Sequence, residues 1–395
     1  MYFSRIAGII SASIWLAVVA TIPDALAQEK LKIGIIGQFS GPFAIVGKQY
    51  QQGVEAYMAT YGSRVGGREI EVVYRDVGGP NASVAKRLAE ELIVRDQVSI
   101  IGGFYLSPEP IAAASVLTET KTPAVVFNGA ATAITESSPY IIRASQMQFQ
   151  EGFVEAQWAI KNGFKRAYVS VSDYAPGHDL LASFRKHYTA LGGEILGEDK
   201  IALNTVDYSP YVERVARAKP NLFMMFIPSG APSINLVKAL SAQGMTGRKD
   251  LAIVGQAQID ENTINLFDDS VIGMYDSLFY AVEAPGAENK KYKDAQLAKF
   301  GAAAELPNYF GASAWDGMHV IYHMIRSQQG KKFDGAAAVK SVLGFKYDGA
   351  KGPQTIEADT RNTTGDFYIR RAVRGPNGKL KLEVADIIKN VKSLP

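Results

Sequence analysis

Residues Leu31–Tyr61 read LKIGIIGQFSGPFAIVGKQYQQGVEAYMATY, and this stretch decides the fold class. A β-rich run, predicted as a strand over Leu31–Ile36, leads into a glycine-containing loop and then a helix over Gly47–Tyr61. The loop Ser40–Phe43 follows the strand, and open α/β sheets bind small ligands at the carboxyl ends of their strands. This loop is therefore a candidate ligand contact, with a plain strand–helix turn as the alternative.

The segment before this stretch predicts export. Residues 1–27 carry a positive charge at Arg5, an apolar run over Ile6–Ala20 and the small-residue ending ALA at 25–27, the pattern of a secretory signal peptide. Cleavage is expected after Ala27, which places the mature protein in the periplasm. The apolar run is short for a membrane-spanning helix, so an uncleaved anchor is the less favoured alternative.

Composition and charge exclude several classes of function. The chain of 395 residues has 42 Lys and Arg against 39 Asp and Glu, and its net charge is +3. Because the charges are mixed along the sequence, a nucleic-acid partner is not expected. The chain has no cysteine, which excludes disulfides, thiolate nucleophiles and cysteine-ligated zinc. The length predicts about two domains.

Strand-like and helical segments alternate along the chain, which predicts an α/β fold with parallel sheets covered by helices on both faces. Two sheets fit the length. Their strands are predicted at Leu31–Ile36, Ile70–Arg75, Ser99–Ile101 and Ala124–Phe127, and at Ala167–Ser172, Ile195–Ile201, Leu222–Ile227 and Leu251–Val254. Helices are predicted again between residues 289 and 343, and Gly375–Gly378 predicts a hairpin near the C-terminus. No flexible linker marks the boundary near 143–150, which indicates strand-like crossovers acting as a hinge.

Two segments of the first predicted sheet are candidates for an anion site. The sequence SPEP at 107–110 is typical of a helix start, with Ser107 as N-cap and Pro108 at the first helical position. Asn128–Thr132 follows a strand and is rich in small residues, which let a ligand approach backbone N–H groups, and Thr132 adds a hydroxyl donor. We predict that these segments hold a carboxylate; a simple cap and a tight turn are the alternatives.

The sequence contains no recognisable catalytic motif. Gly41–Lys48 has five residues between its two glycines where a phosphate loop needs four, and Gln49 replaces the required Ser or Thr. His319 and His323 are four apart on a helix but lack the glutamate of a zinc-protease motif. No GxSxG elbow and no paired carboxylates stand out. We predict no catalytic residue, no metal and no cofactor.

Five segments, taken in order, carry a resemblance to a known family. The mature chain resembles the type I periplasmic solute-binding proteins of ABC transporters, the group related to the leucine/isoleucine/valine-binding protein. The segments are IGIIGQFSGPFAIVGKQYQQGVEAY (33–57), IIGGFYLSPEP (100–110), VVFNGAAT (125–132), YIIRASQMQFQEG (140–152) and PNYFGASAWDGMHVI (307–321).

This resemblance implies an α/β fold of two doubly wound parallel-sheet lobes, joined by a three-crossover hinge and closing on a solute. Lobe 1 is expected to comprise residues 28–146 plus about 277–350, and lobe 2 residues 147–276 plus about 351–395. Ligand contacts are implied at the matching segments of both lobes. With the aromatic candidates, the predicted ligand-binding set is Ser40, Phe43, Tyr105, Ser107, Ala130, Ala131, Thr132, Tyr174, Ser229, Gln256, Gln258 and Tyr309.

One departure from the family bears on the ligand. Amino-acid-binding members place a carboxylate just after the glycine of the last segment, where this chain has Gln256-Ala257-Gln258. A buried ammonium without a counter-charge costs several kcal/mol, so a simple organic acid is predicted unless Asp173 or Asp179 reaches the site. Aromatic side chains at the cleft favour an aromatic acid; they are Phe43, Phe104, Tyr105, Tyr174 and Tyr309.

The predicted function is to deliver a small organic acid to the permease and ATPase subunits of a membrane ABC transporter, and the protein is expected to be a monomer. A branched-chain amino acid or amide binder is the alternative within this class. A ligand sensor for a membrane receptor or regulator is the alternative from another class, and an exported α/β enzyme is a third.

Overall fold

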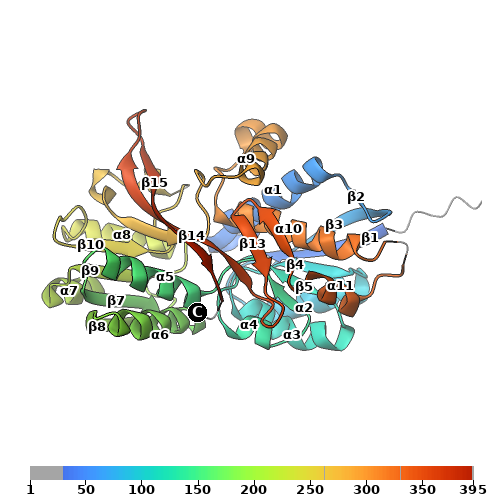
Figure 1. The fold of residues 1–395 in the computed structure, drawn as a ribbon, viewed down its shortest axis with the longest axis horizontal. Helices are drawn as coiled ribbons and strands as arrows, with labels where there is room; N and C mark the ends of the chain where they lie inside the picture. The colour runs from blue at the N-terminus through green and yellow to red at the C-terminus, as the bar shows by residue number, and fades with distance from the viewer. Residues whose placement is uncertain (1–29, 262, 330, 394–395) are drawn as a thin grey trace, which may run out of the picture.

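The computed structural model describes residues 30–261, 263–329 and 331–393. Its strands form two sheets, and the parallel part of each sheet lies in its own half of an elongated molecule (Figure 1). The predicted signal segment and its cleavage site lie outside the described residues.

The first sheet has the strand order β2-β3-β1-β4-β5-β6. All of its neighbours pair in parallel except β2 and β3, which are antiparallel. Its strands are β1 (Lys30–Gly37), β2 (Arg64–Val65), β3 (Arg68–Asp76), β4 (Ile100–Gly103), β5 (Ala124–Val126) and β6 (Ile141–Arg143).

The second sheet has the order β12-β13-β14-β11-β10-β9-β7-β8, with β15 paired to β14. Its β11-β10-β9-β7-β8 portion is parallel, whereas the strands on the other side pair antiparallel. Its strands are β7 (Arg166–Ser172), β8 (Glu194–Ile201), β9 (Leu222–Phe226), β10 (Ala252–Gly255), β11 (Tyr275–Leu278), β12 (Lys346–Gly349), β13 (Gly352–Ile356), β14 (Thr363–Arg374) and β15 (Leu380–Val391).

Helices cover both faces of each sheet. In β1, Ile35 packs in the core with α1 and α10, whereas Ile36 packs with α2 and α3. In β7, Val169 packs with α5 and α6, and Tyr168 with α7 and α8. Strands buried on both faces read as continuous apolar runs, which is why they could be located from the sequence. The helices are α1 (Ala44–Tyr61), α2 (Ala82–Glu90), α3 (Pro108–Thr120), α4 (Ala133–Glu136), α5 (Gln148–Lys161), α6 (Ala175–Ala190), α7 (Ser209–Ala218), α8 (Ala231–Ala242), α9 (Ala287–Phe300), α10 (Tyr309–Arg326) and α11 (Gly335–Val342).

The chain passes between the two halves more than once. After β6 it enters α5 and builds the second sheet; after β11 it returns, and α9 and α10 pack on α1 (Figure 1). It then crosses again along β14, which pairs with β13 at its start and with β11 further on. We call the first sheet with α1–α4 and α9–α11 the first lobe, and α5–α8 with β7–β11, β14 and β15 the second lobe.

A close helix contact fixes α10 on the first lobe. A side-chain carbon added at Gly53 in α1 would lie 2.5 Å from the backbone oxygen of Gly311 in α10, so only glycine permits this approach. Trp315 of α10 is fully buried, and its Nε1 donates to Glu288 Oε1 at 3.0 Å. These contacts place Tyr309, the first residue of α10, at the junction with the second lobe.

The predicted α/β fold with two mainly parallel sheets is confirmed, and α3 begins at Pro108, where the segment SPEP predicts a helix start. Strand β11 ends at Leu278, where the chain leaves the sheet to return to the first lobe. The elements that were not predicted from the sequence are β2, α4, α5, β6, β12 and β13.

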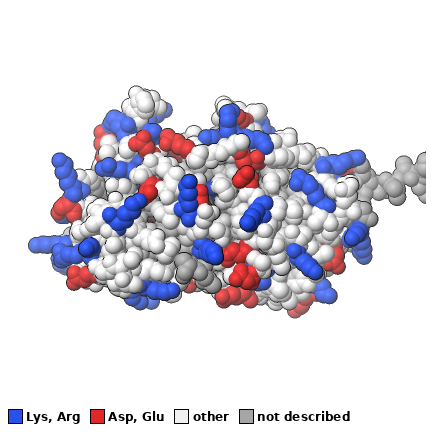
Figure 2. Space-filling view, in the orientation of Figure 1, with Lys and Arg blue, Asp and Glu red and all other residues white. Residues whose placement is uncertain are grey.

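Basic and acidic side chains are mixed over the face shown in Figure 2, without a large area of one sign. In the described part of the chain, no helix has both the length and the apolar character needed to cross a membrane.

Candidate ligand-binding site

A cavity lies between the lobes, at the carboxyl ends of strands from both sheets. The space between its lining atoms, with the open solvent at its mouth included, is about 580 Å³. The first lobe contributes Tyr105, Leu106, Ser107, Asn128, Ala130 and Tyr309, and the segment entering α5 contributes Gln146, Met147, Gln148 and Glu151. The rest of the lining is Tyr174, Pro176, Phe226, Pro228, Ser229, Gln256, Ala257, Leu278 and Phe279.

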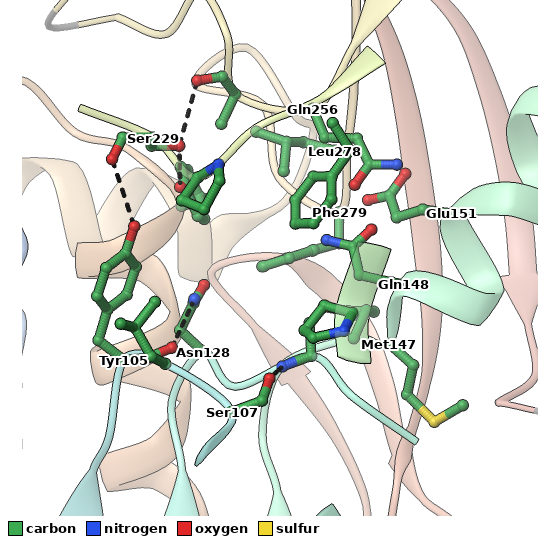
Figure 3. A pocket seen from close by; sticks show the side chains of 18 of the residues that line it. Tyr105, Ser107, Asn128, Met147, Gln148, Glu151, Ser229, Gln256, Leu278 and Phe279 are labelled. Atoms are coloured by element: carbon green, nitrogen blue, oxygen red, sulfur yellow. Dashed lines mark hydrogen bonds between the residues drawn. The ribbon is translucent and has the colours of Figure 1, made fainter. Parts of the chain in front are cut away.

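Ser107 organises the first-lobe end of the cavity (Figure 3). Although it is the N-cap residue of α3, its side chain makes no capping hydrogen bond. Its Oγ instead accepts from the backbone N–H groups of Ala130 and Ala131, each at 3.1 Å. With two N–H donors at its oxygen, the Ser107 hydroxyl keeps its hydrogen to donate to an acceptor in the cavity.

A buried cation lies beneath this small-residue turn. Arg143, at the end of β6, is fully buried and donates to the backbone oxygens of Gly129, at 2.8 Å, and Ala131, and to Asn362 Oδ1 at 3.0 Å. Among the described residues no carboxylate forms an ion pair with it. Burial lowers the pKa of Arg143 to about 9, against the opposing charges of Asp179 and Glu136. Arg143 thus places a positive charge beneath the turn, and the acids Asp179 and Glu136 act on it without forming an ion pair.

Aromatic rings form the walls, and they meet across the lobes. The ring of Tyr105 packs on Phe43 at a centroid distance of 5.2 Å, and Tyr174 stacks on Phe226 at 6.0 Å. The hydroxyl of Tyr105 donates to the Ser229 backbone oxygen at 3.4 Å, and Ser229 Oγ lies 2.9 Å from the Tyr309 hydroxyl. These contacts close one side of the cavity against solvent.

The second-lobe end presents acceptors instead. Glu151 in α5 is 3% exposed, and its Oε2 accepts from Ser277 Oγ at 2.7 Å. Its Oε1 has no hydrogen-bond partner among the described residues, and the same holds for Oε1 of Gln148 and of Gln256. Figure 3 shows these three side chains together on one side of the cavity, away from Ser107.

Behind Glu151 lies a buried group of acids with one buried arginine. Arg370 of β14 pairs with Asp276 and with Glu261, the latter at 2.7 Å. Burial opposes the charge of Arg370, but Glu261 and Asp276 outweigh it and raise its pKa. Glu155, one turn beyond Glu151, accepts from Gln256 Nε2 at 3.3 Å. Burial raises the pKa of Glu155 to about 8 and that of Glu151 well above its usual value.

Seven of the twelve residues predicted to bind the ligand line this cavity, and five do not. The seven are Tyr105, Ser107, Ala130, Tyr174, Ser229, Gln256 and Tyr309. Ala131 is buried behind them and contributes its N–H to Ser107. Phe43 supports the ring of Tyr105, and Ser40 is exposed on the loop before it.

Thr132 and Gln258 have structural partners in this arrangement. The Thr132 backbone N–H donates across the lobes to Asp179 Oδ2 at 2.7 Å. Asp179 thereby reaches the turn that the sequence analysis assigns to a ligand carboxylate. Gln258 closes the turn after β10, since its Oε1 accepts from the Gln256 N–H at 2.6 Å and its Nε2 donates to the Ile227 oxygen at 2.7 Å.

Sequence analysis misses Gln148 and Glu151, because the segment before them reads as a crossover. The available signal is the helical spacing of Phe149, Phe153 and Val154, but it is interrupted by polar residues that turn out to be buried.

The described residues contain no group of three or more His, Asp or Glu side chains that could hold a metal. His323 Nε2 lies 3.1 Å from the Ser341 backbone oxygen, away from the cavity.

Comparisons with known proteins agree with this fold. Residues 30–378 match the family model described as "Periplasmic binding protein". Among curated proteins, Leu/Ile/Val-binding protein homolog 6 of Brucella melitensis is 34% identical over 363 residues, which cover 92% of this chain and 93% of the relative.

Solved structures give the same result. A solute-binding protein of an ABC transporter from Rhodopseudomonas palustris HaA2, in complex with p-hydroxybenzoic acid, has a TM-score of 0.88 at 33% identity, covering 92% of this chain and 98% of that one. One from R. palustris BisB5, in complex with 3,4-dihydroxybenzoic acid, has a TM-score of 0.86 at 32% identity and the same coverage. The chain therefore belongs to the periplasmic binding protein family, as an extracytoplasmic solute-binding protein of the type that serves ABC transporters.

Proposed function

We propose that this protein captures an aromatic carboxylic acid between its lobes and delivers it to an ABC importer. The observation that carries the proposal is the hydroxyl donor that Ser107 presents at the first-lobe end of the cavity. A ligand carboxylate there accepts from the Ser107 hydroxyl and lies above Arg143, a buried guanidinium with no carboxylate partner in the described chain. Buried charges in proteins are normally compensated, and a ligand carboxylate adds a negative charge to those of Asp179 and Glu136, which act on Arg143 without forming an ion pair.

The walls of the cavity favour a flat ring. Tyr105, Tyr174, Phe226, Phe279 and Tyr309 all line it. Ring–ring contacts contribute about 0.5–1.5 kcal/mol per pair beyond the burial of apolar area. The two R. palustris relatives, at 32–33% identity, were solved with hydroxylated benzoic acids, which supports the same class of ligand for this chain.

Calorimetric titration tests the ligand class. Benzoate, 4-hydroxybenzoate, leucine and leucinamide are titrated into the purified protein, and we expect the aromatic acids to bind more tightly than either leucine compound. Failure of every aromatic acid to bind would overturn the proposal. Loss of uptake of the bound acid in a deletion strain separates transport from sensing.

A branched-chain amino acid is the second candidate, for two reasons. The curated Brucella relatives are Leu/Ile/Val-binding homologues, and Glu151 brings a carboxyl group into the cavity. Paired ligands decide between the candidates: phenylpropanoate against phenylalanine, and 4-methylpentanoate against leucine. We expect the simple acid to bind at least about tenfold more tightly in each pair. Asp179 is engaged by the Thr132 N–H and does not line the cavity, so the ammonium loses hydration without gaining a charged partner. Preference for both amino acids would favour the second candidate.

The remaining parts of the proposal concern export and assembly. We propose that the signal segment is cleaved after Ala27 and that the mature protein acts as a monomer without enzymatic activity, meeting the permease and ATPase subunits of its transporter. We further propose that residues 28–146 with 277–350, and 147–276 with 351–395, move as two bodies about the crossovers. Mass spectrometry of the exported protein and scattering with and without ligand test these statements.

A further inference from the structure

The second-lobe end of the cavity has more acceptors than the protein itself satisfies. Oε1 of Glu151, Gln148 and Gln256 each lack a partner within the described residues, although all three side chains are more than nine-tenths buried. Buried acceptors are nearly always paired, so unpaired ones at a cavity wall indicate a donor on the ligand. Figure 3 shows the carboxyl of Glu151 turned toward Gln256 and Gln148.

The charges around Glu151 determine its form. Two buried cations lie nearby, and both are engaged: Arg370 pairs with Asp276 and Glu261, and Lys351, which lies over the Phe279 ring, pairs with Asp316 at 3.7 Å. Within the described residues, Glu155 of the same helix accepts only from the Gln256 amide, and Ser277 supplies a hydroxyl to Glu151. Because none of these neighbours forms an ion pair with Glu151, its burial favours the neutral carboxylic acid.

A neutral carboxyl group can donate one hydrogen bond and accept others. A ring hydroxyl on the ligand does the same, so the two groups satisfy each other, whereas a bare ring edge leaves Glu151 Oε1 unpaired. An ammonium is matched less well, because the neutral acid gives it no counter-charge.

We propose that Glu151, with the amides of Gln148 and Gln256, recognises a hydroxyl group on the ligand ring opposite its carboxylate, so that the protein selects hydroxylated over unsubstituted aromatic acids. The inference rests on the proposed function, since it requires a carboxylate at the Ser107 end. The first-lobe and second-lobe ends of the cavity then bind opposite edges of one ring, and Glu151 is a specificity-determining residue.

Three ligands and three variants test this inference by calorimetry. The ligands are benzoate, 4-methylbenzoate, which fills the same space without a donor, and 4-hydroxybenzoate. Glu151→Leu removes the polar group, and Glu151→Gln keeps a donor and an acceptor in nearly the same shape. Glu155→Gln is the matched control, since Glu155 is a buried acid one turn away that does not line the cavity.

We expect the wild-type protein to bind 4-hydroxybenzoate at least tenfold more tightly than either other acid. The ratio should fall to within about twofold in Glu151→Leu and stay near the wild-type value in Glu151→Gln and Glu155→Gln. Equal wild-type affinities for the three acids, or an unchanged ratio in Glu151→Leu, would overturn the inference and leave the proposed function standing. If no aromatic acid binds the wild-type protein, both the inference and the proposed function are overturned. The wild-type ligand series gives a result even if Glu151→Leu does not fold.

Discussion

The two ends of the cavity differ in how their polar atoms are satisfied. At the first-lobe end, the turn after β5 is fully engaged: Ser107 accepts from its N–H groups, and Arg143 donates to its carbonyls. At the second-lobe end, carboxyl groups outnumber cations and several acceptors have no partner in the described chain. The difference gives the cavity a direction, with one end suited to an anion and the other to a hydrogen-bond donor.

The largest expected effect comes from removing the charge at the anion end. Arg143→Met leaves the carbonyls of Gly129 and Ala131 and the Asn362 side chain without their buried donor. Each such loss costs about 1–3 kcal/mol, so we expect the free energy of unfolding to fall by at least about 3 kcal/mol. Affinity for an aromatic acid should fall as well. Urea unfolding and calorimetry measure the two effects.

A nearby arginine provides the control. Arg361 donates to the backbone oxygens of Ile141, at 3.2 Å, and Thr135, neither of which lines the cavity. Arg361→Met should lower stability and leave affinity near the wild-type value. If the two variants lose affinity equally, the loss in Arg143→Met comes from general destabilisation. The result would then contradict a role of the Arg143 charge in binding the ligand.

The next effect separates Ser107 from Thr132, which the sequence analysis places in one cradle. Ser107→Ala removes the hydroxyl donor to the ligand and the acceptor for two backbone N–H groups, so we expect binding to weaken by about 1.5–3 kcal/mol. Thr132→Val keeps the backbone N–H, which donates to Asp179. Because the side chain at 132 does not line the cavity, the binding free energy should change by less than about 0.5 kcal/mol. A large loss of affinity in Thr132→Val would indicate that the Thr132 hydroxyl contacts the ligand.

Much of the fold could be predicted because local signals agree with the tertiary structure. The central strands β4, β5, β7, β9 and β10 are apolar runs buried on both faces, and α3 begins where Ser107 and Pro108 predict a helix start. Several loops that line the cavity could be located for the same reason, since they follow strands that are easy to recognise.

Helix α5 and its acid were missed because its inner face is polar. Gln150 is fully buried, and its amide donates to the backbone oxygens of Thr363 and Val391, which tie the crossovers together. Glu151 and Glu155 are buried beside it. In a sequence these residues look like the solvent side of a helix, so the amphipathic pattern fails at the segment that carries the donor-binding end of the cavity.

The smallest expected effect is a pH dependence of stability that arises at the acid-rich end. Glu155 faces Gln256, Glu151 and Asp276, and burial raises its pKa to about 8. An unfolded glutamate has a pKa of about 4.3, so the folded protein binds this proton more tightly than the unfolded chain. The contribution to stability is therefore complete below pH ~4.3 and is lost as the pH rises toward 8.

Between pH 5.5 and 8, the free energy of unfolding of the wild-type protein should fall further than that of Glu155→Gln, by at least about 1.4 kcal/mol, the equivalent of one pKa unit. Urea unfolding at the two pH values measures this difference, with Glu119→Gln on an exposed position of α3 as the control that should behave like wild type. Equal decreases in the free energy of unfolding for wild type and Glu155→Gln would mean that Glu155 is ionised in the folded protein. The second-lobe end would then be negatively charged, which contradicts its description as an end with neutral acids.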